Sequence, residues 1–279
     1  MKEEIYLNAA LKLVRSAGNL VRTAFATPDS SIKTKASNID LVTETDNEVE
    51  KLIFDGLRAQ FPDHRFIGEE SSGHKKFEWT DHPTWICDPI DGTTNFVHRC
   101  PHICISVGLT IKKELRVGIV YNPILDQLYT AKAGGGAYMN GFPISTSNTD
   151  SINKAVLCAS MCLHARPTKP DAVEKALENM RRFGNAGFRG VRNFGAAALH
   201  LAYVADGSID GYYEYGLHCW DMCAGALLVR EAGGCVIDPT GADLQLMSQR
   251  ILVAGTNQLA KEMSKQLVHL DFPPEAVIV

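Results

Sequence analysis

The amino-acid sequence predicts an α+β protein in which helices pack against sheets in layers. Apolar residues recur at helical spacing in several segments, and short apolar runs typical of strands lie between these segments. Strand-like and helix-like segments also follow one another on both sides of a polar stretch from Ser145 to Asn153. We therefore expect two sub-domains, residues 1–145 and 146–279, with a site in the cleft between them.

The first half of the chain begins with two predicted helices. Apolar residues from Leu7 to Phe25 recur at helical spacing, and Pro28 ends that segment. The polar stretch Asp29 to Asn38 is expected to form a loop. Thr45-Asp46-Asn47-Glu48 has the spacing of a capping box and predicts a second helix that ends near Pro62. The strands predicted after it are Arg65 to Ile67, Thr84 to Cys87, Ile103 to Thr110, Val117 to Tyr121 and Gln127 to Thr130.

The second half alternates between the same two kinds of element. Its predicted strands are Ala155 to Ser160, Ile209 to Glu214 and Ile251 to Ala254. Its predicted helices are Asp171 to Phe183, Gly195 to Ala205, Asp221 to Ala232 and Thr256 to Val268. Gly233-Gly234 ends the third of these helices, since glycine is the preferred residue just past a helix end.

Composition and charge exclude several classes of protein. The 279 residues are 45% hydrophobic and 22% charged, which is ordinary for a folded protein and unlike a disordered or fibrous chain. The 28 basic and 32 acidic side chains give 28 − 32 = −4, so nucleic acid and anionic membranes are not expected as main partners. No apolar stretch approaches the ~20 residues of a membrane-spanning helix.

The amino terminus and the cysteines predict a cytoplasmic location. Met1-Lys2-Glu3-Glu4 leads into an amphipathic pattern without the apolar block of a signal peptide. None of the eight cysteines forms a Cys-x-x-Cys pair, which argues against a zinc ribbon. We therefore expect reduced thiols that behave as small buried hydrophobic side chains.

The segment from Trp85 to Asn95 carries the most chemical information. An apolar strand leads to Asp88, Pro89 bends the chain, and Asp91 follows three positions after Asp88. Gly92-Thr93-Thr94 then offers backbone N–H groups and hydroxyls at the start of a helical turn. Two acids beside such a turn fit cations that lie between the carboxylates and a bound phosphate.

Two further acidic positions extend this pattern. Glu69-Glu70 follows a predicted strand, and Asp221 begins a predicted helix. Two carboxylates about 4 Å apart repel by roughly 4 kcal/mol at an effective dielectric constant of about 20, so converging acids need divalent cations between them. Ligands that are all oxygen favour magnesium or manganese over zinc.

Each acid also has a simpler structural use when it is taken singly. Asp88 and Asp91 could be turn formers beside Pro89 and Gly92, and Asp221 a residue favoured at a helix start. The paired glutamates could be solvated charges. As an ordered set with this spacing, however, the acids favour a metal site.

Three motifs carry a resemblance to a known family. Asp88-Pro-Ile-Asp-Gly-Thr-Thr-Asn95, Gly68-Glu-Glu-Ser71 and Trp220-Asp-x-x-Ala-Gly225 resemble the inositol monophosphatase family of lithium-sensitive phosphatases. The similarity extends from the first helix to the last. It implies a layered αβαβα sandwich of the sugar-phosphatase type, with mixed sheets and helices between and outside them. It also implies an Mg²⁺-dependent phosphate-monoester hydrolase.

Matched by motif, the resemblance implies two or three metal ions in one site. One would be held by Glu69, Asp88 and the carbonyl oxygen of Ile90, and a second by Asp88, Asp91 and Asp221. A weaker third ion would lean on Glu69 and waters. Mg²⁺ is the expected cofactor, Mn²⁺ a possible substitute and Li⁺ an inhibitor.

The resemblance also implies catalytic and substrate-binding roles. The attacking water would be activated by metal and oriented by Thr93, with Asp46 and Glu69 behind it. Gly92 and Thr93 would contact the phosphate, and Lys35 matches a lysine on a mobile loop. The hydroxyls of an inositol would meet Asp91, Gly195, Ala196, Ala197, Glu214 and Asp221.

The function that follows from the resemblance is hydrolysis of myo-inositol monophosphate to myo-inositol and phosphate by a homodimer. The chain departs from the family at Gly195-Ala196-Ala197, which lacks one hydroxyl, and at the basic loop His164-Ala165-Arg166-Pro167. We hypothesise that Arg166 or Arg192 favours substrates with a second phosphate. Two alternatives stay open: a broader sugar-phosphate or fructose-bisphosphate phosphatase, and a non-catalytic regulator that binds metal or a sugar phosphate.

Overall fold

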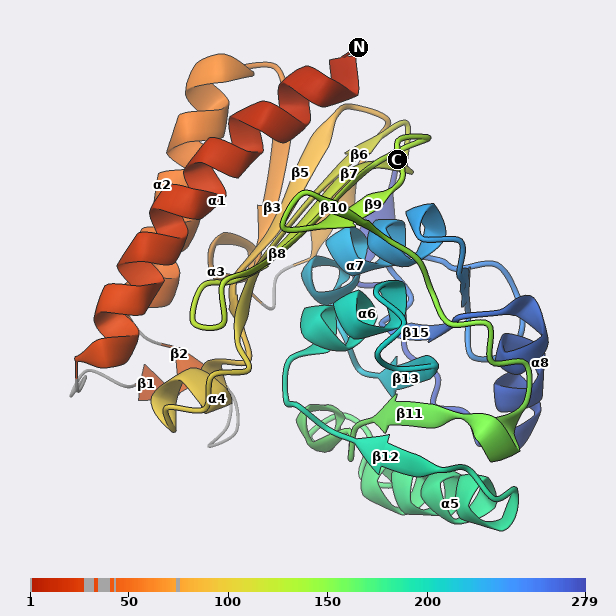
Figure 1. Cartoon of the computed structure of the whole chain (residues 1–279). Coiled ribbons are helices and arrows are strands. Elements are labelled where there is room, and N and C mark those ends of the chain that lie inside the picture. The colour runs from red at the N-terminus through yellow and green to blue at the C-terminus, as the bar shows by residue number, and fades with distance from the viewer. Residues whose placement is uncertain (1, 28–32, 35–40, 43, 74–75) are drawn as a thin grey trace.

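The computed structural model describes residues 2–27, 33–34, 41–42, 44–73 and 76–279. Within these residues the main elements stack in five layers (Figure 1). Helices α1 and α2 cover one face of a larger sheet, α6 and α7 lie between that sheet and a smaller one, and α5 and α8 lie outside the smaller sheet. The predicted αβαβα sandwich with mixed sheets is confirmed.

The larger sheet has seven strands in the order β10-β9-β8-β7-β6-β5-β3. These strands are β3 (Arg65–Gly68), β5 (Thr84–Asp91), β6 (Cys104–Ile111), β7 (Glu114–Asn122), β8 (Gln127–Lys132), β9 (Ala137–Met139) and β10 (Phe142–Ile144). Strand β5 pairs parallel with β3 and antiparallel with β6, so the sheet is mixed. It extends to Asp91, beyond the predicted end at Cys87, and its register with β6 shifts between Asp88 and Asp91. Pro89 lies in this bulge, where a residue without an N–H group is tolerated.

The smaller sheet has the order β12-β11-β13-β15-β14. Its strands are β11 (Val156–Ala159), β12 (Gly190–Arg192), β13 (Gly211–Tyr215), β14 (Cys235–Ile237) and β15 (Arg250–Ala254). The sequence pattern predicted β11, β13 and β15 but not the two three-residue strands at the edges. The larger sheet ends at β10 and the smaller one begins at β11. The division into sub-domains at residue 145 itself stays a prediction.

Helices α1 (Lys2–Ala26) and α2 (Glu44–Gln60) cover the outer face of the larger sheet. Helix α2 begins at Glu44, so Thr45 lies inside the first turn and is not the capping residue that the sequence predicted. The prediction of a loop from Asp29 to Asn38 is also wrong in part, because Lys33–Thr34 forms strand β1, paired with β2 (Leu41–Val42). The other residues of that loop lie outside the described residues.

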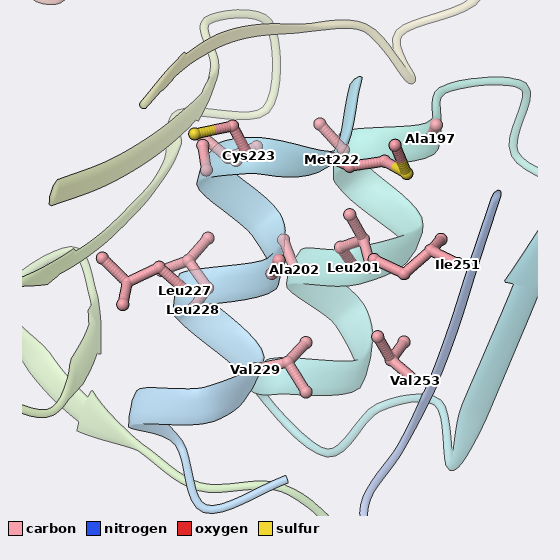
Figure 2. Packing of buried hydrophobic residues seen from close by; sticks show 14 of the residues in the cluster. Ala197, Leu201, Ala202, Met222, Cys223, Leu227, Leu228, Val229, Ile251 and Val253 are labelled. Atoms are coloured by element: carbon pink, nitrogen blue, oxygen red, sulfur yellow. The ribbon is translucent and has the colours of Figure 1, made fainter. Parts of the chain in front are cut away.

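Helices α6 (Ala197–Ala205) and α7 (Cys219–Glu231) form the buried centre of the molecule. Figure 2 shows Ala202 of α6 close to Leu228 of α7, and Leu201 on the side of Ile251 in β15. The helices approach closely because a Cβ atom at Gly225 would lie 2.5 Å from the Cβ of Leu201. Close packing of this kind leaves little freedom to the residues at the start of α7.

The carboxyl-terminal residues pair with a strand from the first half of the chain. Strand β16 (Ala276–Ile278) pairs parallel with β4 (Phe77–Trp79), and the sequence pattern predicted neither of them. The remaining elements are α3 (Glu69–Ser72), α4 (Thr93–Val97), α5 (Ala172–Asn185), α8 (Asn257–Gln266) and the short helices Ile152–Lys154 and Leu163–Ala165.

The eight cysteines are free thiols, and six of them are buried, as the sequence predicted. Among the described residues, no helix combines the length and the apolar character needed to cross a membrane.

Candidate active site

A cavity of about 980 Å³ lies where loops of the two sheets meet. Its walls come from the ends of β3, β5 and β13 and from the starts of α3, α4, α6 and α7. Of the residues predicted for the site, it is lined by Glu69, Asp88, Ile90, Asp91, Gly92, Thr93, Gly195, Ala196, Ala197, Glu214 and Asp221. Side chains from distant parts of the sequence therefore face one space.

Three carboxylates form a cluster in this cavity. Asp88, Asp91 and Asp221 each offer an oxygen atom, and the three atoms lie within 4.8 Å of one another. Asp88 and Asp91 are 2% and 7% exposed, so water screens their charges poorly. Strand β5 supplies the first two acids and the first turn of α7 supplies the third.

Burial and mutual repulsion disfavour the charged forms of these acids. Burial raises the pKa of Asp88 well above its ordinary value, and the charges of Glu69 and Asp91 add to the effect. Burial likewise raises the pKa of Asp91, with repulsion from Asp221. It raises the pKa of Asp221 to about 6, although the adjacent His218 opposes the rise. An all-oxygen cluster with these properties fits hard divalent cations such as Mg²⁺, which would keep the acids ionised.

The turn after Asp88 is fixed by its own hydrogen bonds. Asp88 Oδ1 accepts the backbone N–H of Ile90 at 3.0 Å, and the carbonyl oxygen of Ile90 accepts the hydroxyl of Thr93 at 3.1 Å. Gly92 has φ +90°, and a Cβ atom there would lie 3.1 Å from the carbonyl oxygen of His102. Only glycine therefore combines this backbone angle with this close approach.

Asp91 also joins the two halves of the cavity. Its Oδ1 and Oδ2 accept the backbone N–H groups of Ala197 and Ala198 at 3.1 and 2.6 Å. These groups belong to the first turn of α6, where a negative charge is favoured by the helix dipole. The carboxylate thus holds the start of α6 against the end of β5.

The position of Glu69 depends on a second glutamate, which the sequence analysis missed. Glu50 in α2 is 5% exposed, and its carboxylate accepts the backbone N–H groups of Glu70 at 2.8 Å and Ser71 at 2.9 Å. It thereby caps the short helix α3, which begins at Glu69. The available signal was an acid next to Val49 on the apolar face of a predicted helix.

One predicted residue does not line the cavity, and another lies outside the described residues. Asp46 is fully buried in the first turn of α2, and its neighbour Asn47 lines the cavity in its place. Lys35 lies outside the described residues.

The cavity is also lined by Glu214, on β13, which is 5% exposed. Its Oε2 accepts the hydroxyl of Tyr212 at 2.5 Å, and its Oε1 lies 3.7 Å from His164 Nε2. In the loop at 160–168, His164 lines the cavity and Arg166 does not, and Arg192 does not line it either. The hypothesis that either arginine selects a second phosphate therefore gains no support from the position of these side chains.

Asn95, part of the predicted motif, supports the site from the side. Its amide donates to the carbonyl oxygens of His102 at 2.7 Å and Phe194 at 2.6 Å. Gly195 lies directly against it with φ +79°, since a Cβ atom there would be 2.9 Å from the amide nitrogen of Asn95. The Asn95 side chain therefore fixes the loop that leads into α6.

Comparisons with known proteins agree with this geometry. A family model described as "Inositol monophosphatase family" matches residues 2–270. Inositol monophosphatase 1 of Mus musculus is 40% identical over 262 residues, which are 94% of this chain and 93% of that protein. Inositol monophosphatase 2 of Rattus norvegicus is 42% identical over 264 residues, or 94% of this chain and 90% of that protein. The crystal structure of the extragenic suppressor protein suhB from Bartonella henselae superposes with a TM-score of 0.83 at 32% identity, and covers 94% of this chain and 98% of that one.

Proposed function

The chain belongs to the inositol monophosphatase family and is a phosphoric monoester hydrolase, and we propose that it hydrolyses myo-inositol monophosphate with Mg²⁺ as cofactor. The products are myo-inositol and phosphate. The observation that carries this proposal is the cluster of Asp88, Asp91 and Asp221 beside the turn at Gly92-Thr93 in one cavity.

The cluster and its neighbours supply the ligands. Glu69, Asp88 and the Ile90 carbonyl would hold one cation, and Asp88, Asp91 and Asp221 a second, with a weaker third at Glu69. Bound divalent cations neutralise the charge of a phosphate monoester and lower the pKa of water. Mn²⁺ is expected to substitute and Li⁺ to inhibit.

The residues of the chain bind the phosphate, orient the attacking water and accept its proton. The backbone N–H groups of Gly92 and Thr93 bind phosphate oxygens. The Thr93 hydroxyl donates to the Ile90 carbonyl, so its oxygen can accept a hydrogen bond from the attacking water. A threonine hydroxyl is a weak base, so the proton of the water would pass to the carboxylate of Glu69, which lines the cavity, with Asp46 behind it in the buried first turn of α2.

The polyol end of the cavity sets substrate preference. Carboxylates of Asp91, Glu214 and Asp221 can each accept a hydrogen bond from a ring hydroxyl. The segment Gly195-Ala196-Ala197 also lines the cavity, with backbone and small side chains. This combination fits an uncharged polyol ring better than a second phosphate, which the acids would repel.

A substrate panel tests the proposal. Purified protein with Mg²⁺ is assayed for phosphate release from myo-inositol 1-phosphate, fructose 1,6-bisphosphate, glucose 6-phosphate and glycerol 2-phosphate. The proposal expects the highest kcat/KM for the inositol ester and no release in excess chelator. Equal or higher kcat/KM for the hexose phosphates would favour the broader sugar-phosphate phosphatase. Leu163, Pro167 and Phe272 on the cavity wall could accommodate such substrates.

We also propose a cytoplasmic homodimer, a role in inositol metabolism and phosphatidylinositol signalling, and division of the chain into sub-domains at residues 1–145 and 146–279. Light scattering of the protein as it elutes from a size-exclusion column measures its mass in solution, which is expected to be twice the 30.5 kDa of one chain. Limited proteolysis tests whether cleavage near residue 145 releases two stable fragments.

A further inference from the structure

A buried carboxylate near the carboxyl end of the chain contacts the segment that carries Asp221. The side chain of Glu275 is 6% exposed. Its Oε1 accepts the backbone N–H of Cys219 at 2.7 Å, and its Oε2 accepts the Nδ1–H of His218 at 2.6 Å. Both oxygens are therefore bound to residues at the very start of α7, two and three positions before Asp221.

His218 connects Glu275 to Asp221. Its backbone N–H donates to Asp221 Oδ2 at 2.7 Å. Its ring stacks on Trp220, with centroids 4.6 Å apart and an interplanar angle of 18°. Because the backbone, the ring face and Nδ1 of His218 are all engaged, the orientation of one Asp221 oxygen depends on this chain of contacts.

Glu275 is itself held from both sides. Its backbone N–H donates to the carbonyl oxygen of Met247 at 3.1 Å. The next three residues form β16, paired with β4, and the N–H of Val279 donates to the carbonyl oxygen of Trp79 at 3.1 Å. Glu275 thus lies directly before a paired strand, and hydrogen bonds fix the backbone on both sides of its carboxylate.

We propose that Glu275 is a positioning residue for the metal site, which holds His218 and thereby directs Asp221 toward Asp88 and Asp91. The inference rests on the proposed function in one respect, that divalent cations bind at this cluster. Groups that hydrogen-bond to a metal ligand typically affect metal affinity or activity by about 10–100-fold, and Glu275 holds such a group, His218. Glu275 lines no part of the cavity, so its effect must pass through the start of α7.

The test compares Mn²⁺ binding by titration calorimetry in three variants. Glu275→Ala removes both acceptors. Glu275→Gln keeps an oxygen that accepts the N–H of Cys219. Its amide NH2 can donate to Nδ1 of His218 when the ring takes the Nε2–H tautomer, so this variant should preserve the geometry. The matched control is Glu231→Ala, because Glu231 ends the same helix and its carboxylate accepts the N–H groups of Gly134 and Gly136, both at 2.8 Å.

We expect Glu275→Ala to weaken Mn²⁺ binding about tenfold or more, and Glu275→Gln by less than about threefold. Glu231→Ala should leave the affinity unchanged even where it lowers thermal stability. In phosphate-release assays at saturating Mg²⁺, Glu275→Ala should keep the wild-type KM for substrate, because the residue does not touch it. Should the alanine variant fail to fold, Glu275→Asp, one methylene shorter, takes its place with the same expectation.

The inference is overturned if Glu275→Ala binds Mn²⁺ as tightly as Glu231→Ala, or if the wild type binds no Mn²⁺. A wild type that binds Mn²⁺ but releases phosphate from no monoester contradicts the proposed function and leaves the inference on Glu275 standing.

Discussion

Asp91 accepts the backbone N–H of Ala198 at 2.6 Å, across 107 positions of sequence. A residue at the end of the larger sheet therefore caps a helix of the central layer while its carboxylate also faces Asp88 and Asp221. One side chain thus serves both the fold and the cluster, and substitutions can separate the two uses.

Replacing Asp91 with asparagine tests this separation. The amide oxygen can still accept one N–H group of α6, but the negative charge of the cluster is reduced. We expect phosphate release to fall by about 100-fold or more, with little change in the circular dichroism spectrum. The control is Asp238→Asn, because Asp238 is 4% exposed and pairs with Arg250 Nε at 2.7 Å outside the cavity. The Asp238→Asn variant should be less stable than the wild type and keep its turnover. Near-normal turnover of Asp91→Asn would overturn the two-metal assignment.

The raised pKa values predict a pH-dependent response to cations. The folded-state pKa of Asp221 is about 6 against an ordinary 3.8, and the pKa values of Asp88 and Asp91 are raised as well. Without cations, these acids contribute stability at low pH that is lost as the pH rises through their folded-state pKa values. Cations compete with the protons, so the gain in melting temperature on adding Mg²⁺ should grow from pH 5 to pH 8. The same gain at every pH would contradict the cluster as the binding site.

The stability contribution of His200 depends on pH in the opposite direction to that of the acid cluster. It is 1% exposed, its Nε2 accepts the backbone N–H of Phe194 at 2.9 Å, and burial lowers its pKa to about 3 from 6.5. The neutral side chain therefore contributes stability above pH 6.5 that is lost as the pH falls toward 3. At pH 5 the loss amounts to about 2 kcal/mol. Urea unfolding at pH 7 and pH 5 should show a smaller drop for His200→Gln than for wild type, whereas the exposed control His82→Gln should behave as wild type.

Asn95 predicts a link between stability and the loop before α6. Asn95→Ala leaves the carbonyl oxygens of His102 and Phe194 without the amide donor. We expect a loss of about 1–3 kcal/mol in the free energy of unfolding, measured in urea. Thr94→Ala serves as the control, since Thr94 is its exposed neighbour and should change stability by less than about 0.5 kcal/mol. An Asn95→Ala variant as stable as Thr94→Ala would refute the role of the amide.

The sequence could predict the parts of this site that local chemistry determines. Pro89 restricts the backbone and Gly92 permits a positive φ, so the bend within β5 and the helical turn after it follow from residue type. Long apolar stripes likewise predict α1, α2 and the central strands. Edge strands of three residues such as β4 and β16 carry too few apolar positions to be recognised before their partner is known.

The supporting residues could not be predicted, because they act across the fold. Glu275 lies 57 positions from His218, and nothing in its local sequence distinguishes it from a surface acid. The choice between His164 and Arg166 at the cavity depends on a backbone detail, since Cys162 has φ +52° and begins the short helix Leu163–Ala165. Which side chain of such a loop faces inward is set by tertiary packing rather than by composition.

Anomalous scattering from crystals soaked in Mn²⁺ tests the central claim most directly, because it locates each ion without reference to activity. The account predicts peaks between the carboxylates of Asp88, Asp91 and Asp221, with a further peak at Glu69 and the Ile90 carbonyl. A map without a peak among these oxygens, at a Mn²⁺ concentration that supports phosphate release, would contradict it.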